Sequence, residues 1–187
     1  MKRYLYWIVY TFYLFVIQQI KVYSKNIKIE SSDDIKNFNE ISKNEYSNEL
    51  IMEFTQNYYD MTVLRDTEEH TNNVNTSQDV VIRGISNGTI LDYFNENNGN
   101  FRIDINDVKG ERHITFENLI FKDYNSSGQN TVGVITIINN LSFTNIYIKF
   151  YNCTFIENSN NIIQIIMESK KLSILEESPI LFENCHF

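Results

Sequence analysis

Proline, glycine, tryptophan and cysteine are all scarce in this sequence: its 187 residues include one proline, six glycines, one tryptophan and two cysteines. Basic residues are also outnumbered, with 16 Lys and Arg against 24 Asp and Glu, which gives a net charge of −8. No cluster of Lys and Arg offers the attraction that a phosphate backbone needs, so we expect no binding to nucleic acid. The cysteines form no CxxC pair, so we expect no metal site and no cofactor.

Asparagine and isoleucine, by contrast, make up more than a quarter of the residues. Isoleucine, phenylalanine and tyrosine favour β-strands. Asparagine favours bends and tolerates left-handed backbone conformations. The composition therefore suits a β-rich solenoid.

One short phrase recurs at residues 114–121, 148–155 and 180–187. Each copy reads apolar, any, apolar, any, Asn, apolar or Cys, any, Phe, and the Asn residues are 34 and then 32 positions apart. A fainter copy has Gly84 at the Asn position, 34 residues before Asn118. Periods of this length are typical of stacked repeats, so we predict about three to four coils.

Alternation within the phrase predicts which side chains point inward. The apolar residues before the Asn share one face, and a bend at the Asn resets the phase, so the residues one and three places later also point inward. Asn and Gly tolerate the left-handed backbone that such a bend demands, and stacked Asn side chains can hydrogen-bond from coil to coil. The predicted corner residues are Gly84, Asn118, Asn152 and Asn184.

We divide the chain into a signal segment at residues 1–24, a polar leader at residues 25–78 and the repeats at residues 79–187. In the leader we predict a short helix over residues 33–38, capped by Ser31 or Ser32, and a strand over residues 50–54; the polar residues 65–79 are expected to form a loop. Two interpretations of the leader stay open: a cap on the apolar end of the stack, or a partly ordered linker.

The repeats resemble the right-handed parallel β-helix coils of the pectin-lyase-like superfamily, and especially its non-enzymatic secreted and surface proteins with an Asn-Cys-x-Phe corner. Residues 152–155 and 184–187 carry that corner here. The resemblance implies an all-β, right-handed parallel β-helix over residues 79–187. It implies no particular activity, since the same scaffold carries lyases, hydrolases and adhesive stalks. Because the last copy ends on the inward Phe187, we expect a chain truncated at its C-terminus.

The first residues have the layout of a secretory signal peptide. Lys2 and Arg3 precede an apolar run over residues 4–17, and Val22 and Ser24 stand at −3 and −1 of a cleavage site. The run is shorter than the ~20 residues that span a bilayer, which favours cleavage over an uncleaved anchor. Only an anchor would bring the protein to a membrane, and in both cases we expect a secreted or cell-surface location.

Glycosylation sequons fit that location. Asn152 is at a corner and is expected to turn into the stack, which makes it a poor acceptor. The better candidates are Asn75, Asn87, Asn125 and Asn140.

Cys153 and Cys185 occupy the same place in neighbouring copies, directly after the Asn. A pair of cysteines in a secreted protein invites a disulfide. In-register parallel neighbours, however, point their Cβ bonds the same way, which is a poor start for a disulfide. We therefore favour stacked, buried free thiols and keep the disulfide as the alternative.

An enzyme on this fold would need converging carboxylates, or carboxylates with a basic partner. The residues of this kind that follow or alternate with strand positions are Asp92, Asp104, Asp107, Asp123, Arg83 and Arg102. Each of them also fits a solvated strand face, and the paired-Asp and Gly-His motifs of the pectinolytic families are absent. His70, His113 and His186 form no motif, so we assign no catalytic residue.

Tyrosine side chains offer a third interpretation, because exposed aromatic rings can stack on sugars, although outward tyrosines are also common in strands. The tyrosines considered are Tyr58, Tyr59, Tyr93, Tyr124, Tyr147 and Tyr151. We predict a secreted or surface module with a structural or adhesive role, whose partners are extracellular polysaccharide or surface proteins. The alternative is a carbohydrate-active β-helix enzyme (a polysaccharide lyase or glycoside hydrolase) or a fragment of one.

Overall fold

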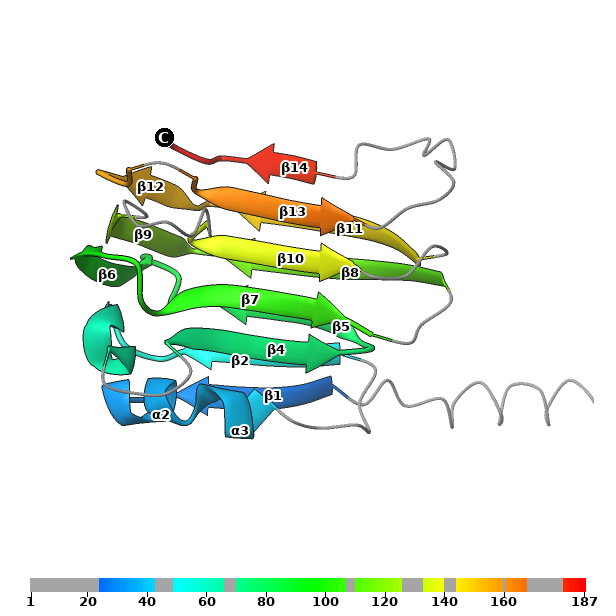
Figure 1. Cartoon of the computed structure of the whole chain (residues 1–187), viewed down its shortest axis with the longest axis horizontal. Helices are drawn as coiled ribbons and strands as arrows, with labels where there is room; N and C mark the ends of the chain where they lie inside the picture. The colour runs from blue at the N-terminus through cyan, green and yellow to red at the C-terminus, as the bar shows by residue number, and fades with distance from the viewer. Residues whose placement is uncertain are drawn as a thin grey trace, which may run out of the picture.

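The computed structural model describes residues 24–42, 49–65, 70–106, 110–125, 133–139, 144–159, 161–167 and 180–187. These residues form three sheets in which every strand pair is parallel (Figure 1). Sheet A contains β1 (Ser24–Ile29), β2 (Glu49–Phe54), β5 (Asp79–Arg83), β8 (Gly110–Glu117), β11 (Thr144–Tyr151) and β14 (Ile180–Glu183). Sheet B contains β3 (Tyr58–Asp60), β6 (Thr89–Glu96), β9 (Leu119–Tyr124) and β12 (Thr154–Ile156). Sheet C contains β4 (Thr71–Thr76), β7 (Asn100–Ile105), β10 (Ile135–Asn139) and β13 (Ile163–Met167).

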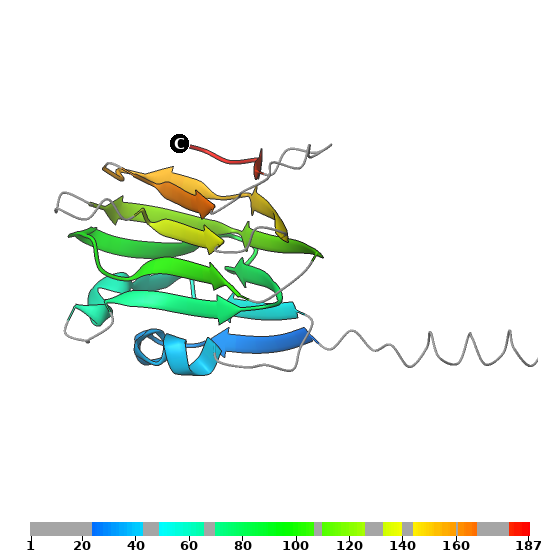
Figure 2. The same cartoon turned by 45° about the vertical axis from the view of Figure 1, so that its right-hand side comes forward.

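The chain visits the sheets in the order A, B, C and then returns to sheet A one layer further along (Figure 2). One coil is thus a set of three consecutive strands. In the described part of the chain these sets are β2-β3-β4, β5-β6-β7, β8-β9-β10 and β11-β12-β13, with β1 before them and β14 after them. The prediction of an all-β, parallel, coiled architecture is confirmed.

The core consists of side chains stacked from coil to coil along the repeated phrase. Phe116 pairs in register with Phe150, and their rings are stacked 5.0 Å apart with an interplanar angle of 7°. Phe121 and Phe155, three places after the corner, are stacked in the same way at 5.1 Å and 8°. All four side chains are buried, so the predicted inward positions are the ones that fill the solenoid.

The corners differ between asparagine and glycine. Asn118, Asn152 and Asn184 have φ of 56°, 52° and 55°, the left-handed conformation expected for them. Gly84 is at the same place in its coil. The Gly84 N–H donates to the Glu117 carbonyl oxygen, just as the Asn118 N–H donates to the Tyr151 carbonyl oxygen one coil later. The φ of Gly84 is outside the left-handed range, so the predicted reason for glycine is wrong. A Cβ at Gly84 would lie 2.4 Å from the Asn118 carbonyl oxygen, and this close approach requires glycine.

The coils begin before residue 79, where sequence placed the boundary. β2, β3 and β4 form a complete coil, and β4 contradicts the loop predicted over residues 65–79. Its sequence, TNNVNT, has little strand character of its own, but β4 pairs with β7 along six residues. Asn72 is buried and donates from Nδ2 to the Gly99 carbonyl oxygen at 2.7 Å, so its amide nitrogen has a partner in the interior, while its Oδ1 has none among the described residues.

The N-terminal end of the solenoid is covered by two short helices, α2 (Ser32–Lys36) and α3 (Phe38–Ser42), which lie beside β1 (Figure 1). α2 is capped by Ser31, one of the two predicted caps, and Ser31 forms a capping box with Asp34. Ile35 and Phe38 are buried, and the Phe38 ring packs edge-on against Phe101 at 5.8 Å. These residues are therefore packed against the core.

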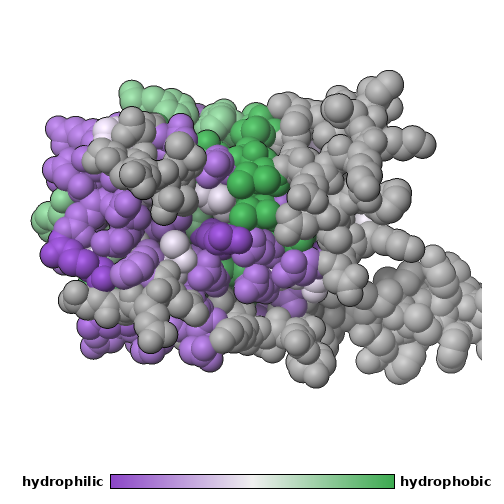
Figure 3. Space-filling model, in the orientation of Figure 1, coloured by the Kyte–Doolittle hydropathy of each residue, from purple (hydrophilic) through white to green (hydrophobic). Residues whose placement is uncertain are grey.

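The opposite end carries β14, whose phenylalanines continue the stacks but are exposed. Phe182 is stacked on Phe150 at 4.9 Å and is 42% exposed, while Phe187 is stacked on Phe155 at 5.1 Å and is 74% exposed. On the face shown in Figure 3, a narrow apolar strip also crosses β10 and β13, where Ile138 and Ile166 are in register.

The predicted signal segment lies outside the described residues except for Ser24, the first residue of β1. No helix among the described residues is long and apolar enough to cross a membrane.

Candidate functional site

The outward face of sheet B carries two of the carboxylates considered as catalytic candidates, Asp92 and Asp123. Strand alternation turns Leu91 and Tyr93 into the core and turns Asp92 toward the outward face of the sheet, where neighbouring side chains cover it. Asp60, Asp92 and Lys122 follow one another in register on β3, β6 and β9. The coil stacking therefore places two acidic side chains and one basic side chain in a single row.

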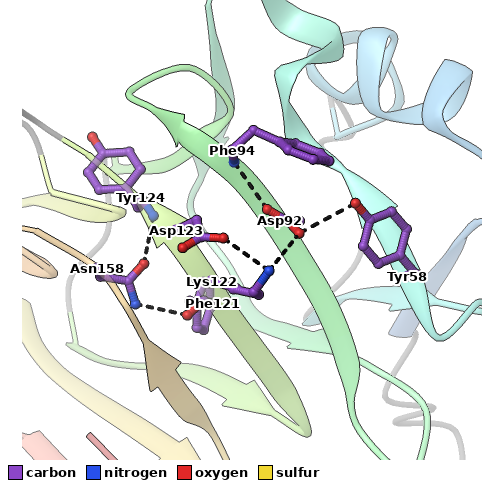
Figure 4. Close-up of polar contacts among 8 residues, drawn as sticks. All are labelled: Tyr58, Asp92, Phe94, Phe121, Lys122, Asp123, Tyr124 and Asn158. Atoms are coloured by element: carbon purple, nitrogen blue, oxygen red, sulfur yellow. Dashed lines mark hydrogen bonds and ion pairs between the residues drawn. The ribbon is translucent and has the colours of Figure 1, made fainter.

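Asp92 is the centre of this row. Its side chain is only 6% exposed and accepts three contacts, which Figure 4 shows. Oδ1 accepts from the Phe94 backbone N–H at 3.1 Å, and Oδ2 accepts from the Tyr58 hydroxyl at 3.4 Å. Lys122 Nζ lies 3.2 Å from the same Oδ2. A nearly buried carboxylate is thus compensated by one cation and two neutral donors.

Lys122 also contacts Asp123, at 3.0 Å between Nζ and Oδ2. Hydrogen bonding to Asp123, and then to Asp92, raises the pKa of the Lys122 ammonium. The ammonium therefore stays protonated around neutral pH and would be a poor proton acceptor. Its position suits binding and positioning better than general base catalysis.

Two exposed aromatic rings flank Asp92 on the side away from Asp123 (Figure 4). Tyr58 is 40% exposed and Phe94 is 52% exposed. Phe94 is on the surface because φ is 49° at Phe94 and 61° at Asn95, where the pairing of β6 with β9 shifts register. Burial and the Asp92 charge raise the pKa of the Tyr58 hydroxyl, which stays a hydrogen-bond donor.

The corner beyond Asp123 is fixed from the next coil. Asn158 donates from Nδ2 to the Phe121 carbonyl oxygen at 2.8 Å and accepts at Oδ1 from the Tyr124 N–H at 2.9 Å. Asp123 itself has φ of 58°, which this clamp holds in place. The Asp123 side chain is 18% exposed and faces Lys122.

The other candidate catalytic residues lie on other sheets. Arg102 and Asp104 form an ion pair of 3.0 Å on sheet C, and Arg83 lies 3.6 Å from Glu117 on sheet A. Asp107 lies outside the described residues. The candidates therefore do not converge on one groove, apart from Asp92 and Asp123, which share Lys122 as a counterion.

The histidines are also apart. His113 stacks on Tyr147 on sheet A, with ring centroids 5.2 Å apart, and His186 is exposed opposite Thr154 on sheet B. His70 Nδ1 lies 3.1 Å from the Leu64 carbonyl oxygen. Among the described residues no three His, Cys, Asp or Glu side chains are grouped so as to hold a metal ion.

Three tyrosines proposed as exposed stacking residues are in the core: Tyr59, Tyr93 and Tyr124. The interpretation is wrong for these three because strand alternation points them inward, and burial raises the pKa of Tyr124 to about 12. Tyr58 and Tyr151 are exposed, and of the two only Tyr58 borders the Asp92 row.

The glycosylation candidates are distributed over several faces. Asn75 is exposed on β4 and Asn87 is exposed in the turn between β5 and β6. Asn125 is partly exposed and accepts a hydrogen bond from the Ser159 hydroxyl at 2.9 Å, and Asn140 lies outside the described residues. Asn152 is exposed, so the expectation that it turns into the stack is wrong. Its Nδ2 does donate to Asn118 Oδ1 of the neighbouring coil at 2.7 Å.

Both cysteines are free thiols in the structure. Cys153 is buried and its Sγ donates to the Phe116 carbonyl oxygen at 3.4 Å; Cys185 is partly exposed and repeats this contact with Phe150 at 3.4 Å. Burial raises the pKa of the Cys153 thiol to about 12.

We expect one thiol per native molecule to react with a disulfide reagent at pH 8, and two after denaturation. Cys153 is both inaccessible and protonated, whereas Cys185 reaches solvent, so Cys185→Ala should remove the native reaction. Thiol titration with intact mass measurement checks this. An unmodified chain 2 Da lighter than the reduced mass would instead reveal a disulfide.

Comparison of the chain with protein-family models, with curated proteins and with solved structures gives no match. The class of the protein therefore rests on its architecture: it is a parallel β-solenoid.

Proposed function

We propose that the protein is a secreted or cell-surface solenoid with a structural or adhesive role, and that the outer face of sheet B binds polysaccharide. The observation that carries this proposal is the pair of exposed rings, Tyr58 and Phe94, beside the Asp92–Lys122–Asp123 row. Support for the location comes from the signal-like start of the chain and its sequons.

Sugar rings present both apolar C–H faces and hydroxyl groups. Aromatic side chains supply a large, rigid apolar surface for the C–H faces, and nearby charged groups hydrogen-bond to the hydroxyl groups and fix the orientation of the sugar. In this row Lys122 can donate to a sugar oxygen, while the carboxylate of Asp123 can accept from a hydroxyl. A sheet face built from stacked coils is also extended along the stack, which suits a polymer.

A catalytic role would use the same residues, because Asp92 and Asp123 are the two candidate carboxylates that come together. Retaining glycosidases place such a pair about 5–5.5 Å apart, with one carboxyl protonated as the acid. Here both carboxylates are ion-paired with the same Lys122 ammonium, so neither is left as an unpaired carboxyl group for that role. Release of reducing or unsaturated sugars that Asp92→Asn abolishes would establish the enzyme instead.

Tyr58→Ala and Phe94→Ala are each expected to weaken retention on an immobilised polysaccharide about tenfold or more, since truncating an aromatic hot-spot residue typically costs about 2 kcal/mol or more. Affinity electrophoresis of the purified full chain measures the effect. Tyr58→Phe retains the ring and should lose much less than Tyr58→Ala.

The matched control is Tyr151→Ala, because Tyr151 is 37% exposed on sheet A, close to the 40% of Tyr58. Retention by this variant should equal that of the unmodified protein. Equal losses for Tyr58→Ala and Tyr151→Ala, or no loss for either Tyr58→Ala or Phe94→Ala, would rule out a binding site on sheet B.

A further inference from the structure

We infer that the sheet B face selects neutral polysaccharides and rejects acidic ones, such as polyuronates. This inference rests on the proposed function and concerns the chemical class of the glycan. It follows from the balance of charges around the two exposed rings.

The outer face of β3, β6, β9 and β12, together with Glu157 directly after β12, is acidic. In addition to Asp60, Asp92 and Asp123 it carries Glu157, which is exposed and has φ of 55° one coil beyond Asp123. Lys122 supplies the cation of this row, so four carboxylates face one ammonium. Glu96, at the end of β6, is paired with Arg65 and adds no net charge.

The cation of the row is already engaged. Lys122 Nζ lies 3.2 Å from Asp92 and 3.0 Å from Asp123, so two carboxylates already share its charge before a uronate carboxylate reaches the third N–H donor. That uronate carboxylate would also approach Asp92, Asp123 and Glu157, whose negative charges outnumber the single ammonium. Like charges at this range repel, and the partly desolvated surface strengthens the repulsion.

Neutral sugars meet no such barrier. Their hydroxyl groups donate to carboxylate oxygens, and charge-assisted hydrogen bonds of this kind are stronger than neutral ones. The acidic row that excludes a polyanion is therefore a set of acceptors for uncharged hydroxyls. The net charge of the chain, −8, acts in the same direction at longer range.

The test compares retention of the full chain on a neutral panel (a β-glucan, a galactomannan and chitin oligosaccharides) with retention on polygalacturonate. At least one neutral glycan should bind about tenfold more tightly than polygalacturonate at low ionic strength, and the gap should narrow as salt screens the repulsion. Binding of the neutral glycan should not change with salt.

A charge reversal provides the variant. Glu157→Lys should increase retention on polygalacturonate about fivefold or more relative to retention of the same variant on the neutral glycan, because a nearby cation replaces a nearby anion. The matched control is Glu111→Lys, the same change at an exposed position of β8 on sheet A, which should alter neither.

The outcomes separate the two claims. If polygalacturonate binds as tightly as every neutral glycan and Tyr58→Ala abolishes that binding, the neutral preference is overturned and the binding face stands. If Glu111→Lys raises polygalacturonate retention as much as Glu157→Lys does, the selection is a property of net charge and the inference fails. If no glycan is retained, the proposed function is overturned as well.

Discussion

Phe116→Ala is expected to lower the free energy of unfolding by about 3–5 kcal/mol, the range for truncating a fully buried phenylalanine. Phe116 has no exposed surface, and its ring neighbours belong to the next coil of sheet A, to sheet B and to sheet C. Its ring contacts those of Phe150, Phe121 and Phe101, with centroids 5.0, 6.4 and 6.4 Å away. The cavity would lie between Ile82 and Phe150, the register partners of Phe116 in the two adjacent coils, where the neighbours are held by strand pairing and cannot close over it.

Urea denaturation of the purified chain followed by circular dichroism measures this loss. Tyr151→Ala, on the outer face of sheet A, removes a ring of similar size that is 37% exposed and should cost about 1 kcal/mol or less. Phe116→Leu should fall between the two because it leaves a smaller cavity. A loss for Phe116→Ala no greater than that for Tyr151→Ala would contradict the inward register of the phrase.

That register is the part of the fold that the sequence specifies best. The order apolar, any, apolar, any, Asn determines which side of β8 and β11 faces inward, and the structure buries Ile114, Phe116, Ile148 and Phe150 accordingly. A shift by one residue would expose all of them, so a pattern with one buried face leaves little freedom. The left-handed φ at Asn118 and Asn152 follows from the same phrase.

β4 shows where sequence reasoning fails. Its three asparagines and two threonines predict a loop, and Val74 is the one apolar residue of the strand. Pairing with β7 supplies the backbone hydrogen bonds, so the strand is specified by its neighbour in the next coil and hardly by its own propensity. A single sequence without the register of the coils cannot reveal such a strand.

The site could be predicted only in part for a related reason. Asp92 and Asp123 are recognisable as polar residues at strand ends, but their partnership depends on Lys122 coming into register with Asp92 one coil later. Phe94 follows Asp92 by two positions, but the strand is irregular between Asp92 and Glu96. Simple alternation therefore does not predict which way the Phe94 side chain points. Its exposure results from two consecutive left-handed residues, Phe94 and Asn95, and phenylalanine gives no hint of that conformation.

Gly84→Ala is expected to destabilise the protein by about 2–3 kcal/mol, the cost of inserting an atom into a closely packed site. The new Cβ would lie 2.4 Å from the Asn118 carbonyl oxygen and 2.7 Å from both Cβ and Oγ1 of Thr89. Neither neighbour can move independently. Asn118 O accepts from the Thr89 N–H at 2.9 Å, and Thr89 Oγ1 donates to the Gln56 carbonyl oxygen at 2.8 Å, so one displacement disturbs three coils.

The sign of the change in unfolding free energy for Gly84→Ala distinguishes two physical effects. Gly84 has a φ outside the left-handed range, and at such positions alanine ordinarily stabilises a protein by about 0.4–1 kcal/mol through the unfolded state. Backbone conformation and close approach therefore predict opposite results for the same variant. Urea denaturation decides between them, with Ser86→Ala at a neighbouring exposed position as the control that should change little. A gain in stability for Gly84→Ala would mean that the Asn118 carbonyl can retreat. A loss of stability would show that Gly84, in the fainter copy of the phrase, is required for close contact between coils. The same coil contains β6 and therefore Asp92.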